Sequence, residues 1–227
     1  MNIIQSIKSL NQLQLTIWIS SLCIIFISFV LFKTNDMMTL IASLIGATAL
    51  IFVGKGDALG QLLTMVFALF YSIISYECRY YGEMMTYAGM TLPSALFALI
   101  EWLRHPYSQN EVKVKSLTYK DLLFLFISAI VVTIVFGYIL VYFDTANIVW
   151  SIMSVTTSYI ASMLTILRSP YYAIAYCFND IILIILWILA SMNNINYIPM
   201  ILCFIIFFIN DSLGFIQWQN MKKRQTV

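Results

Sequence analysis

The sequence predicts an all-α membrane protein with about eight transmembrane helices. Of its 227 residues, 62% are hydrophobic and only 10% are charged, whereas roughly 25% of the residues in a soluble domain are charged. The apolar residues also gather in segments close to the roughly 20 residues that a helix needs to cross a bilayer. In order, the predicted spans are residues 15–32, 37–53, 58–78, 82–103, 121–143, 147–167, 171–191 and 197–218.

Polar segments and turn residues separate these spans. The first span is followed by polar residues without an Ala-x-Ala cleavage site, which indicates a retained helix rather than a signal peptide. Gly54 to Asp57 reads Gly-Lys-Gly-Asp and predicts a turn after the second span. Pro93 predicts a kink or a broken hydrogen bond within the fourth span. The longest polar segment, Arg104 to Lys120, divides the chain near its middle.

Basic residues are unevenly distributed between the two sides of the membrane. With eight spans, ten of the twelve Lys and Arg residues fall on the side that carries both termini, and only Lys33 and Arg79 fall on the other side. The positive-inside rule then predicts that both termini are cytoplasmic. A basic loop that merely connects two helices is compatible with the same pattern.

A weak internal repeat suggests two related halves. At an offset of 116 residues, Tyr81 pairs with Tyr197 and Trp102 pairs with Trp218. Three-helix units on either side of a single connector helix have the same membrane orientation, which is a parallel repeat. The predicted segments are an N-terminal tail and first helix (1–36), the first three-helix unit (37–104), the loop and connector helix (105–146), the second unit (147–218) and a basic tail (219–227).

Polar side chains in the middle of the last spans are candidates for a binding site. Asn179 and Asp180 lie at the middle of the seventh span, where side chains need partners inside the protein or in water. Helical spacing places Tyr172 and Tyr176 beside them, and transporters with repeats bind substrates near the midplane. Three further polar residues fall at suitable depths in spans three and eight, namely Gln61, Asn210 and Asp211. Hydrogen bonding between helices is the alternative role for all of these groups.

Aromatic residues at the ends of spans allow two interpretations. Trp102 and Trp218 end the last span of each half. Position alone favours membrane-interface belts, but each ring could also close the inner mouth of a transport path, and Trp187 is a further candidate gate. Tyr71 and Tyr87 belong to a group of tyrosines near the outer connection of spans three and four, where interfacial positions are expected.

The composition argues against an enzyme and against a resident metal or cofactor. His105 is the only histidine and lies in a polar loop, and the four cysteines form no Cys-x-x-Cys pair. Clustered carboxylates with the spacing of metal ligands are also missing from the sequence. We therefore expect no catalytic residues, no metal and no cofactor.

Several motifs of the second half resemble the PnuC family of vitamin transporters. They are Arg168-Ser-Pro-Tyr-Tyr-Ala, Asn179-Asp180, Trp187 and the run from Asn210 to Trp218, Asn-Asp-Ser-Leu-Gly-Phe-Ile-Gln-Trp. The resemblance implies a 3+1+3 core related to SWEET transporters, with an extra N-terminal helix, often assembled as a homotrimer. It also implies facilitated diffusion of nicotinamide riboside across the bacterial inner membrane, followed by trapping through phosphorylation in the cytoplasm.

The resemblance assigns substrate binding to Asn179, Asn210 and Gln61. The family commonly has Trp seven and four positions before the Asn of the seventh span, where this chain has Tyr172 and Ala175. Stacking on the substrate then falls to Tyr172 or Tyr176. Three alternatives stay open. They are another vitamin or nucleoside as substrate (thiamine, riboflavin or a deoxynucleoside), proton coupling through Asp180 or Asp211, and a binding subunit of a larger uptake system.

Overall fold

The protein is nearly all-helical in a computed structural model that describes residues 3–32, 37–77, 80–192 and 195–226. Its long helices are α2 (Gln12–Leu31), α3 (Met37–Lys55), α4 (Ala58–Glu77), α6 (Leu92–Arg104), α7 (Tyr119–Tyr142), α8 (Ile148–Ile166), α9 (Tyr172–Ser191) and α10 (Ile198–Gln225). The short elements are α1 (Ile3–Lys8), α5 (Tyr81–Thr86), η1 (Tyr87–Thr91), β1 (Pro106–Ser108), β2 (Glu111–Val112) and η2 (Ile195–Tyr197).

Within these described ranges, seven helices are long and apolar enough to cross a membrane. They correspond to seven of the predicted spans, and this confirms a polytopic membrane protein. The main difference in length is at α10, which continues as a helix to Gln225, beyond the predicted end at 218.

The remaining predicted span, 82–103, consists of three consecutive helical pieces. These are α5, the π-helical turn η1 and α6, and Pro93 lies in the first turn of α6. Pro93 has no backbone N–H, and its ring clashes with the carbonyl four residues earlier, at Gly89. The wider π-helical turn, which contains Gly89, accommodates this clash. The disruption predicted at Pro93 therefore takes the form of a π-helix.

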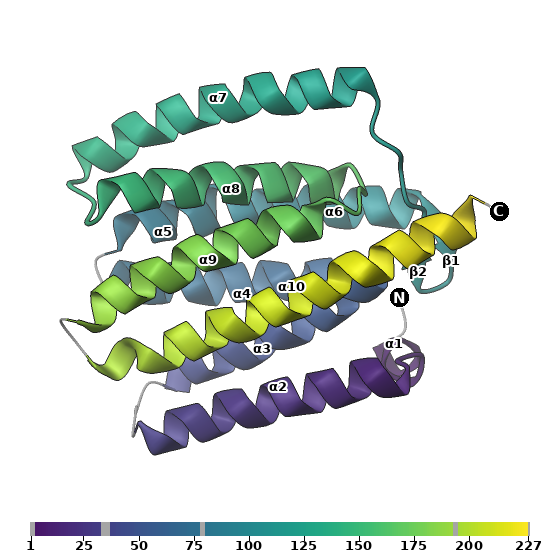
Figure 1. The fold of residues 1–227 in the computed structure, drawn as a ribbon, viewed down its shortest axis with the longest axis horizontal. Helices are drawn as coiled ribbons and strands as arrows, with labels where there is room; N and C mark the ends of the chain where they lie inside the picture. Colours follow the sequence, from purple (N-terminus) through teal and green to yellow (C-terminus); the bar gives the residue numbers. More distant parts are fainter. Residues whose placement is uncertain (1–2, 33–36, 78–79, 193–194, 227) are drawn as a thin grey trace.

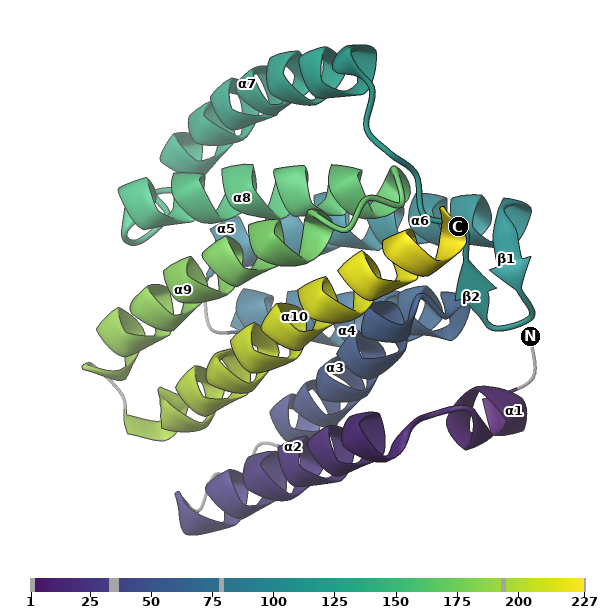
Figure 2. The same cartoon turned by 45° about the vertical axis from the view of Figure 1, so that its right-hand side comes forward.

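Six helical segments form a closed ring (Figures 1 and 2). Helix α3 packs on α4, α4 on α6, α6 on α8, α8 on α9, α9 on α10, and α10 returns to α3. The third helix of each predicted unit thus packs on the first helix of the other unit. This arrangement places polar residues of α4, α9 and α10 around one interior space.

Two helices flank the ring. Helix α2 packs on α3 and α10, and the indole Nε1 of Trp18 donates a 3.0 Å hydrogen bond to Oγ1 of Thr48. Helix α7 packs mainly on α8 and is the least buried of the long helices. Its exposed side chains are largely Leu, Ile, Val and Phe, which suits a surface in contact with lipid.

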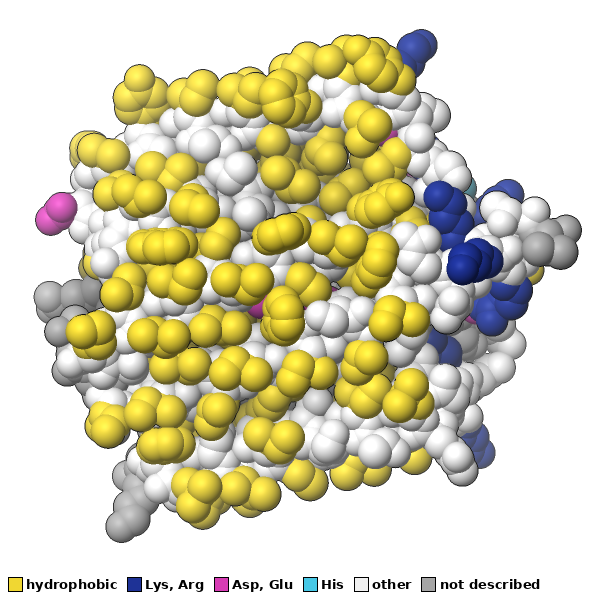
Figure 3. Space-filling model, in the orientation of Figure 1, with side chains coloured by type: hydrophobic (Ala, Val, Ile, Leu, Met, Phe, Trp, Pro, Cys, Tyr) yellow, Lys and Arg dark blue, Asp and Glu magenta, His cyan; other side chains and the backbone are white. Residues whose placement is uncertain are grey.

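One end of the bundle is basic. Both termini and the β1–β2 hairpin lie at this end, and the Lys and Arg side chains visible in Figure 3 gather there, while hydrophobic side chains cover most of the remaining surface. We call it the basic end and the other the opposite end. Lys33 and Arg79, the two predicted exceptions, lie outside the described residues.

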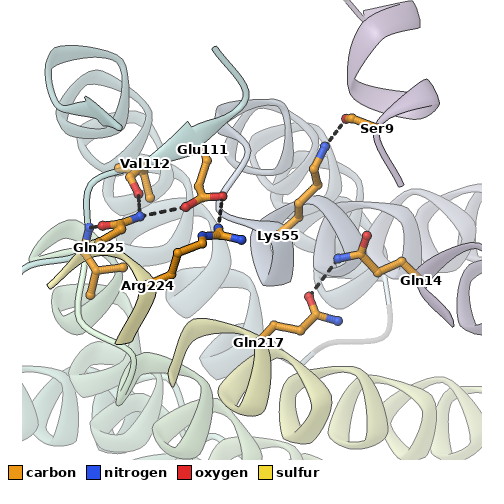
Figure 4. Close-up of polar contacts among 9 residues, drawn as sticks. Ser9, Gln14, Lys55, Glu111, Val112, Gln217, Arg224 and Gln225 are labelled. Carbon is orange, nitrogen blue, oxygen red and sulfur yellow. Dashed lines mark hydrogen bonds and ion pairs between the residues drawn. The ribbon is translucent and has the colours of Figure 1, made fainter. Parts of the chain in front are cut away.

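The C-terminal turns of α10 dock on the hairpin at the basic end (Figure 4). Arg224 pairs with Glu111, and Nε2 of Gln225 donates hydrogen bonds to Oε1 of Glu111 (2.8 Å) and to the carbonyl of Val112 (3.0 Å). The predicted basic tail is therefore helical up to residue 225 and is held against the loop that separates the two units.

Candidate functional site

A cavity lies at the centre of the six-helix ring. Its volume is about 60 Å³, room for roughly two water molecules and far below the several hundred Å³ of a typical ligand site. The cavity is therefore too small to hold a ligand in this conformation. It is lined by Gly46, Ala49, Leu50, Val53, Gln61, Thr64, Phe67, Tyr87, Thr91, Ser158, Thr165, Tyr176, Asn179, Asp180, Phe204, Phe207 and Asp211.

The structure brings five of the predicted site residues to this cavity. They are Gln61 from α4, Tyr176, Asn179 and Asp180 from α9, and Asp211 from α10. Helix α8 holds Asn179 in place, because the hydroxyl of Thr157 donates a 3.0 Å hydrogen bond to its Oδ1. With the oxygen engaged, the amide nitrogen of Asn179 is the group available to a ligand.

Two lining side chains have polar atoms without a hydrogen-bond partner among the described residues. Nε2 of Gln61 and Oδ2 of Asp180 are both fully enclosed and both unpaired, although each side chain is at least 97% buried. An unpaired buried polar group costs on the order of 1–3 kcal/mol. A ligand or water in the cavity would satisfy these atoms, so they mark the wall as a binding surface.

The cavity wall is acidic. The carboxyl groups of Asp180 and Asp211 line the same cavity, and neither makes an ion pair within the described chain. The lining contains no Lys, Arg or His, so no basic side chain of the described wall compensates them. Nor do the described residues group three His, Cys, Asp or Glu side chains in a way that could hold a metal ion. The wall is thus suited to a cationic or hydrogen-bond-donating ligand.

Aromatic rings form the apolar part of the wall, and sequence reasoning found only one of them. Tyr176 lines the cavity as expected, with its hydroxyl 3.2 Å from that of Ser162. Phe67, Tyr87 and the α10 pair Phe204 and Phe207 were not predicted, although they line the same space. Their spacing along apolar helices gives no signal that distinguishes them from ordinary packing residues.

A glycine makes room for two of these rings. A Cβ atom on Gly46 would lie 2.6 Å from the ring of Phe207 and 3.0 Å from that of Phe67. Such distances are too short for a van der Waals contact, so the two rings can approach α3 only because residue 46 has no side chain.

Tyr172 and Asn210 are not part of the cavity lining, in contrast to the prediction. Asn210 precedes Asp211 and therefore points about 100° away around α10, where its Nδ2 lies 3.4 Å from the hydroxyl of Ser21 on α2. Tyr172 lies one helical turn nearer the basic end than Tyr176, and its ring is 5.0 Å from that of Trp218. Contact of these two residues with substrate stays a prediction.

The cavity is closed toward the basic end by tryptophan rings. Trp102 and Trp218 are at most 2% exposed, and their ring centres are 5.3 Å apart. The interpretation of these rings as interfacial belt residues is therefore wrong, because they contact protein on all sides. The role of these rings as a gate stays a prediction.

A second aromatic cluster closes the opposite end. The indole Nε1 of Trp187 donates a 2.9 Å hydrogen bond to the hydroxyl of Tyr71, and the rings of Tyr80 and Tyr197 pack against Trp187 at 5.5 and 5.4 Å. Tyr71 is 1% exposed. The expectation that Tyr71 and Tyr87 are interfacial is thus wrong, since both rings are buried.

A bundle of membrane-spanning helices that encloses a polar cavity with a closure at each end has the architecture of a transporter. The family model described as nicotinamide mononucleotide transporter matches residues 36–220. The chain belongs to this family of membrane transporters, and it is not an enzyme.

Two comparisons with individual proteins agree with this family. The nicotinamide riboside transporter PnuC of Neisseria mucosa is 26% identical over 201 residues, which cover 86% of this chain and 76% of that protein. A crystal structure described as that of the vitamin B3 transporter PnuC superposes with a TM-score of 0.84 at 25% identity, covering 96% of this chain and 94% of the other. The resemblance noted in the sequence is thus confirmed along nearly the whole chain.

Proposed function

We propose that the protein transports nicotinamide riboside rather than nicotinamide mononucleotide. The family model is named for the mononucleotide and the curated relative for the riboside, and the two compounds differ by one phosphate group. The observation that carries the proposal is the composition of the cavity wall, which contains the carboxyl groups of Asp180 and Asp211 and no basic side chain.

The charge of each compound decides between them. Nicotinamide riboside carries one permanent positive charge on its pyridinium ring, whereas the phosphate of the mononucleotide adds negative charge. Phosphate sites in proteins use Arg, Lys or backbone N–H groups at helix N-termini. A phosphate placed beside these carboxyl groups would have no basic partner in the wall. Burying an unpaired phosphate is too costly for such a site to accept it.

The other wall residues suit the remaining parts of the riboside. Tyr176, Tyr87 and Phe67 offer faces and edges to a flat ring. Nε2 of Gln61, which has no partner in the described structure, and the amide of Asn179 can hydrogen-bond a carboxamide or a ribose hydroxyl. A mostly apolar pocket with a few fixed polar groups is the usual form of a small-molecule site.

Transport is proposed to be facilitated diffusion across the bacterial inner membrane, with the basic end in the cytoplasm. The concentration of Lys and Arg at the end that carries both termini supports this orientation. Trapping of the riboside by phosphorylation in the cytoplasm and assembly as a homotrimer are further parts of the proposal, and both follow from the resemblance. Purified protein in liposomes should equilibrate labelled nicotinamide riboside and exclude the mononucleotide. Equal uptake of both compounds would refute the proposed selectivity.

Proton coupling through the same acidic pair is the second candidate. Asp180 and Asp211 line the same cavity. In this candidate mechanism the two acids carry a proton together with the substrate, instead of serving only to neutralise its charge. We favour the counter-charge role because a cationic substrate needs a negative partner in a water-poor cavity. Thiamine, riboflavin and deoxynucleosides stay as substrate alternatives to be compared in the same assay.

A further inference from the structure

We infer that Glu83 forms a second, outer site for the cationic ring of the substrate, on the path between the opposite end and the central cavity. This inference rests on the proposed function, because it requires a positively charged substrate. Glu83 belongs to α5, is 6% exposed and makes no ion pair within the described chain. Glu83 was not among the site residues predicted from the sequence.

A small separate cavity surrounds the carboxyl group of Glu83. Its volume is about 20 Å³, and its wall combines oxygen-bearing side chains with two aromatic rings. It is lined by Tyr80, Glu83, Thr145, Ala146, Ser151, Leu186 and Trp187. Oε2 of Glu83 and Oγ1 of Thr145 are both buried without a hydrogen-bond partner in the described structure. Two unpaired polar atoms that face one small space indicate that a ligand or water completes them.

Three helices place this cavity between the central cavity and the opposite end. On α9, Trp187 follows the cavity residue Asp180 by seven residues, which is about 10 Å along the helix. On α8, Ser151 precedes the cavity residue Ser158 by the same interval. In the α5–η1 segment, Glu83 lies one turn before Tyr87, which lines the central cavity. A substrate that passes the Trp187 closure would therefore meet Glu83 before it reaches Asp180.

A polar connection links the two cavities. The hydroxyl of Ser154 lies close to the carboxyl group of Glu83 and donates a 3.5 Å hydrogen bond to Oδ1 of Asn179. The outer carboxyl group and the amide of the central site are thus separated by one serine side chain. A cation that leaves Glu83 can move toward Asn179 and the acidic pair without crossing an apolar gap.

The composition of the outer wall favours an organic cation. Trp187 and Tyr80 contribute aromatic rings whose centres are 5.5 Å apart, and aromatic faces attract cations such as a pyridinium ring. The small volume reflects the closed state, as it does in the central cavity. The separation of Trp187 from Tyr80 and Tyr197 that opens this end would enlarge the space beside Glu83.

The test compares a charged and an uncharged form of one substrate. Uptake of nicotinamide riboside and of its reduced dihydropyridine form, which has lost the positive charge, is measured in liposomes for the wild type, Glu83→Gln and Glu83→Asp. Glu83→Gln is expected to slow uptake of the cation by on the order of tenfold and to leave the neutral form within about twofold. Glu83→Asp, which keeps the carboxyl group, should retain most of the wild-type rate of uptake of the cation relative to the neutral form. Glu77→Gln, an exposed acid at the same end of the molecule, is the matched control and should behave as wild type.

Other outcomes separate the inference from the proposed function. Equal slowing of both compounds by Glu83→Gln would make Glu83 a structural residue and overturn the inference, while the proposed function would stand. Cation uptake that requires sodium in the wild type and no longer does so in Glu83→Gln would assign the outer site to an inorganic ion and also overturn it. Failure of the wild type to carry either compound would overturn the proposed function, and the role of Glu83 with it.

Discussion

The indole rings of Trp102 and Trp218 lie 5.3 Å apart, and each is hydrogen-bonded to the opposite half of the molecule. Nε1 of Trp102 donates to the carbonyl of Thr165 on α8 at 3.0 Å, and Nε1 of Trp218 donates to the carbonyl of Val53 on α3 at 2.9 Å. The two acceptors lie near the ends of the first helices of the two units. The closure at the basic end thus joins the units through two reciprocal contacts.

Removal of one indole N–H should loosen this closure. Trp218→Phe keeps an aromatic ring but loses a hydrogen bond with a net value of about 1 kcal/mol, which corresponds to a roughly fivefold change in an equilibrium. A cysteine is introduced in place of Ala49, on the cavity wall, and a membrane-impermeant thiol reagent is supplied at the basic end. We expect this cysteine to react about five times faster in Trp218→Phe than in the protein that keeps Trp218. The measurement uses protein whose native cysteines have been replaced by alanine.

Replacement of a different tryptophan by phenylalanine, at the opposite end of the molecule, provides the control. Trp150 lies near the start of α8 and is half-buried, so Trp150→Phe should leave the labelling rate unchanged. An unchanged rate in Trp218→Phe would show that the two tryptophans do not control access to the cavity.

The amide of Gln61 should lower the stability of the ligand-free protein and strengthen the binding of substrate. Its Nε2 is buried without a partner in the described structure, so Gln61→Met replaces an unsatisfied amide with an apolar side chain of similar length. We expect an unchanged or higher melting temperature in the absence of ligand, by about 2–4 °C for each kcal/mol gained, and weaker binding of nicotinamide riboside. Gln217→Met is the contrast, because Gln217 accepts a 3.1 Å hydrogen bond from Gln14 and its loss should lower the melting temperature. Equal destabilisation by both substitutions would mean that the amide of Gln61 is already satisfied.

Gly46 should be required for the aromatic wall. In Gly46→Ala the new Cβ would clash with Phe207 and Phe67, and overpacking of this kind costs about 1–3 kcal/mol. We expect a lower melting temperature and at least a tenfold loss of ligand affinity by calorimetry. Gly89→Ala is the matched control, since nothing lies within 4 Å of a Cβ at that position. Full binding by Gly46→Ala would show that Phe67 and Phe207 do not shape the site.

Two measurements distinguish whether Asp180 and Asp211 neutralise the charge of the substrate or carry a proton. If Asp180 and Asp211 neutralise the pyridinium ring, an imposed pH gradient should not change the uptake of nicotinamide riboside by liposomes whose membrane potential is held at zero, so that the charge of the substrate itself does not drive uptake. Asp211→Asn should weaken binding of the cation more than binding of its reduced, uncharged form, because only the cation loses a charge partner. Uptake that rises with the imposed pH gradient at zero membrane potential would favour proton-coupled transport instead.

The sequence was sufficient to predict the spans and part of the site. Long apolar segments define α2, α3, α4 and α7 to α10 because the requirement to cross lipid leaves a strong signal in composition. Asn179 and Asp180 were found for a related reason, since polar groups are expensive at mid-span and therefore conspicuous. The β1–β2 hairpin and helix α1 were missed, because short polar elements are stabilised by contacts with the rest of the protein rather than by a local pattern.

The inner and outer faces of each helix were harder to assign. Asn210 and Asp211 are adjacent in the sequence, yet only Asp211 lines the cavity. Both sides of α10 are covered by protein, because α2 packs on the side where Asn210 lies. Polar residues on either side therefore look alike in the sequence, which does not show which side faces the interior of the ring. The same ambiguity hid Phe67, Tyr87, Phe204 and Phe207, whose rings differ from lipid-facing ones only in the direction in which they point.

Calorimetric titration of the purified protein with nicotinamide riboside and nicotinamide mononucleotide tests the central claim most directly. We predict that the riboside binds at least tenfold more tightly than the mononucleotide. Asn179→Ala should lose this binding, whereas Asn210→Ala, an equally buried asparagine that faces α2, should keep it. Tighter binding of the mononucleotide, or full binding of the riboside by Asn179→Ala, would contradict the account.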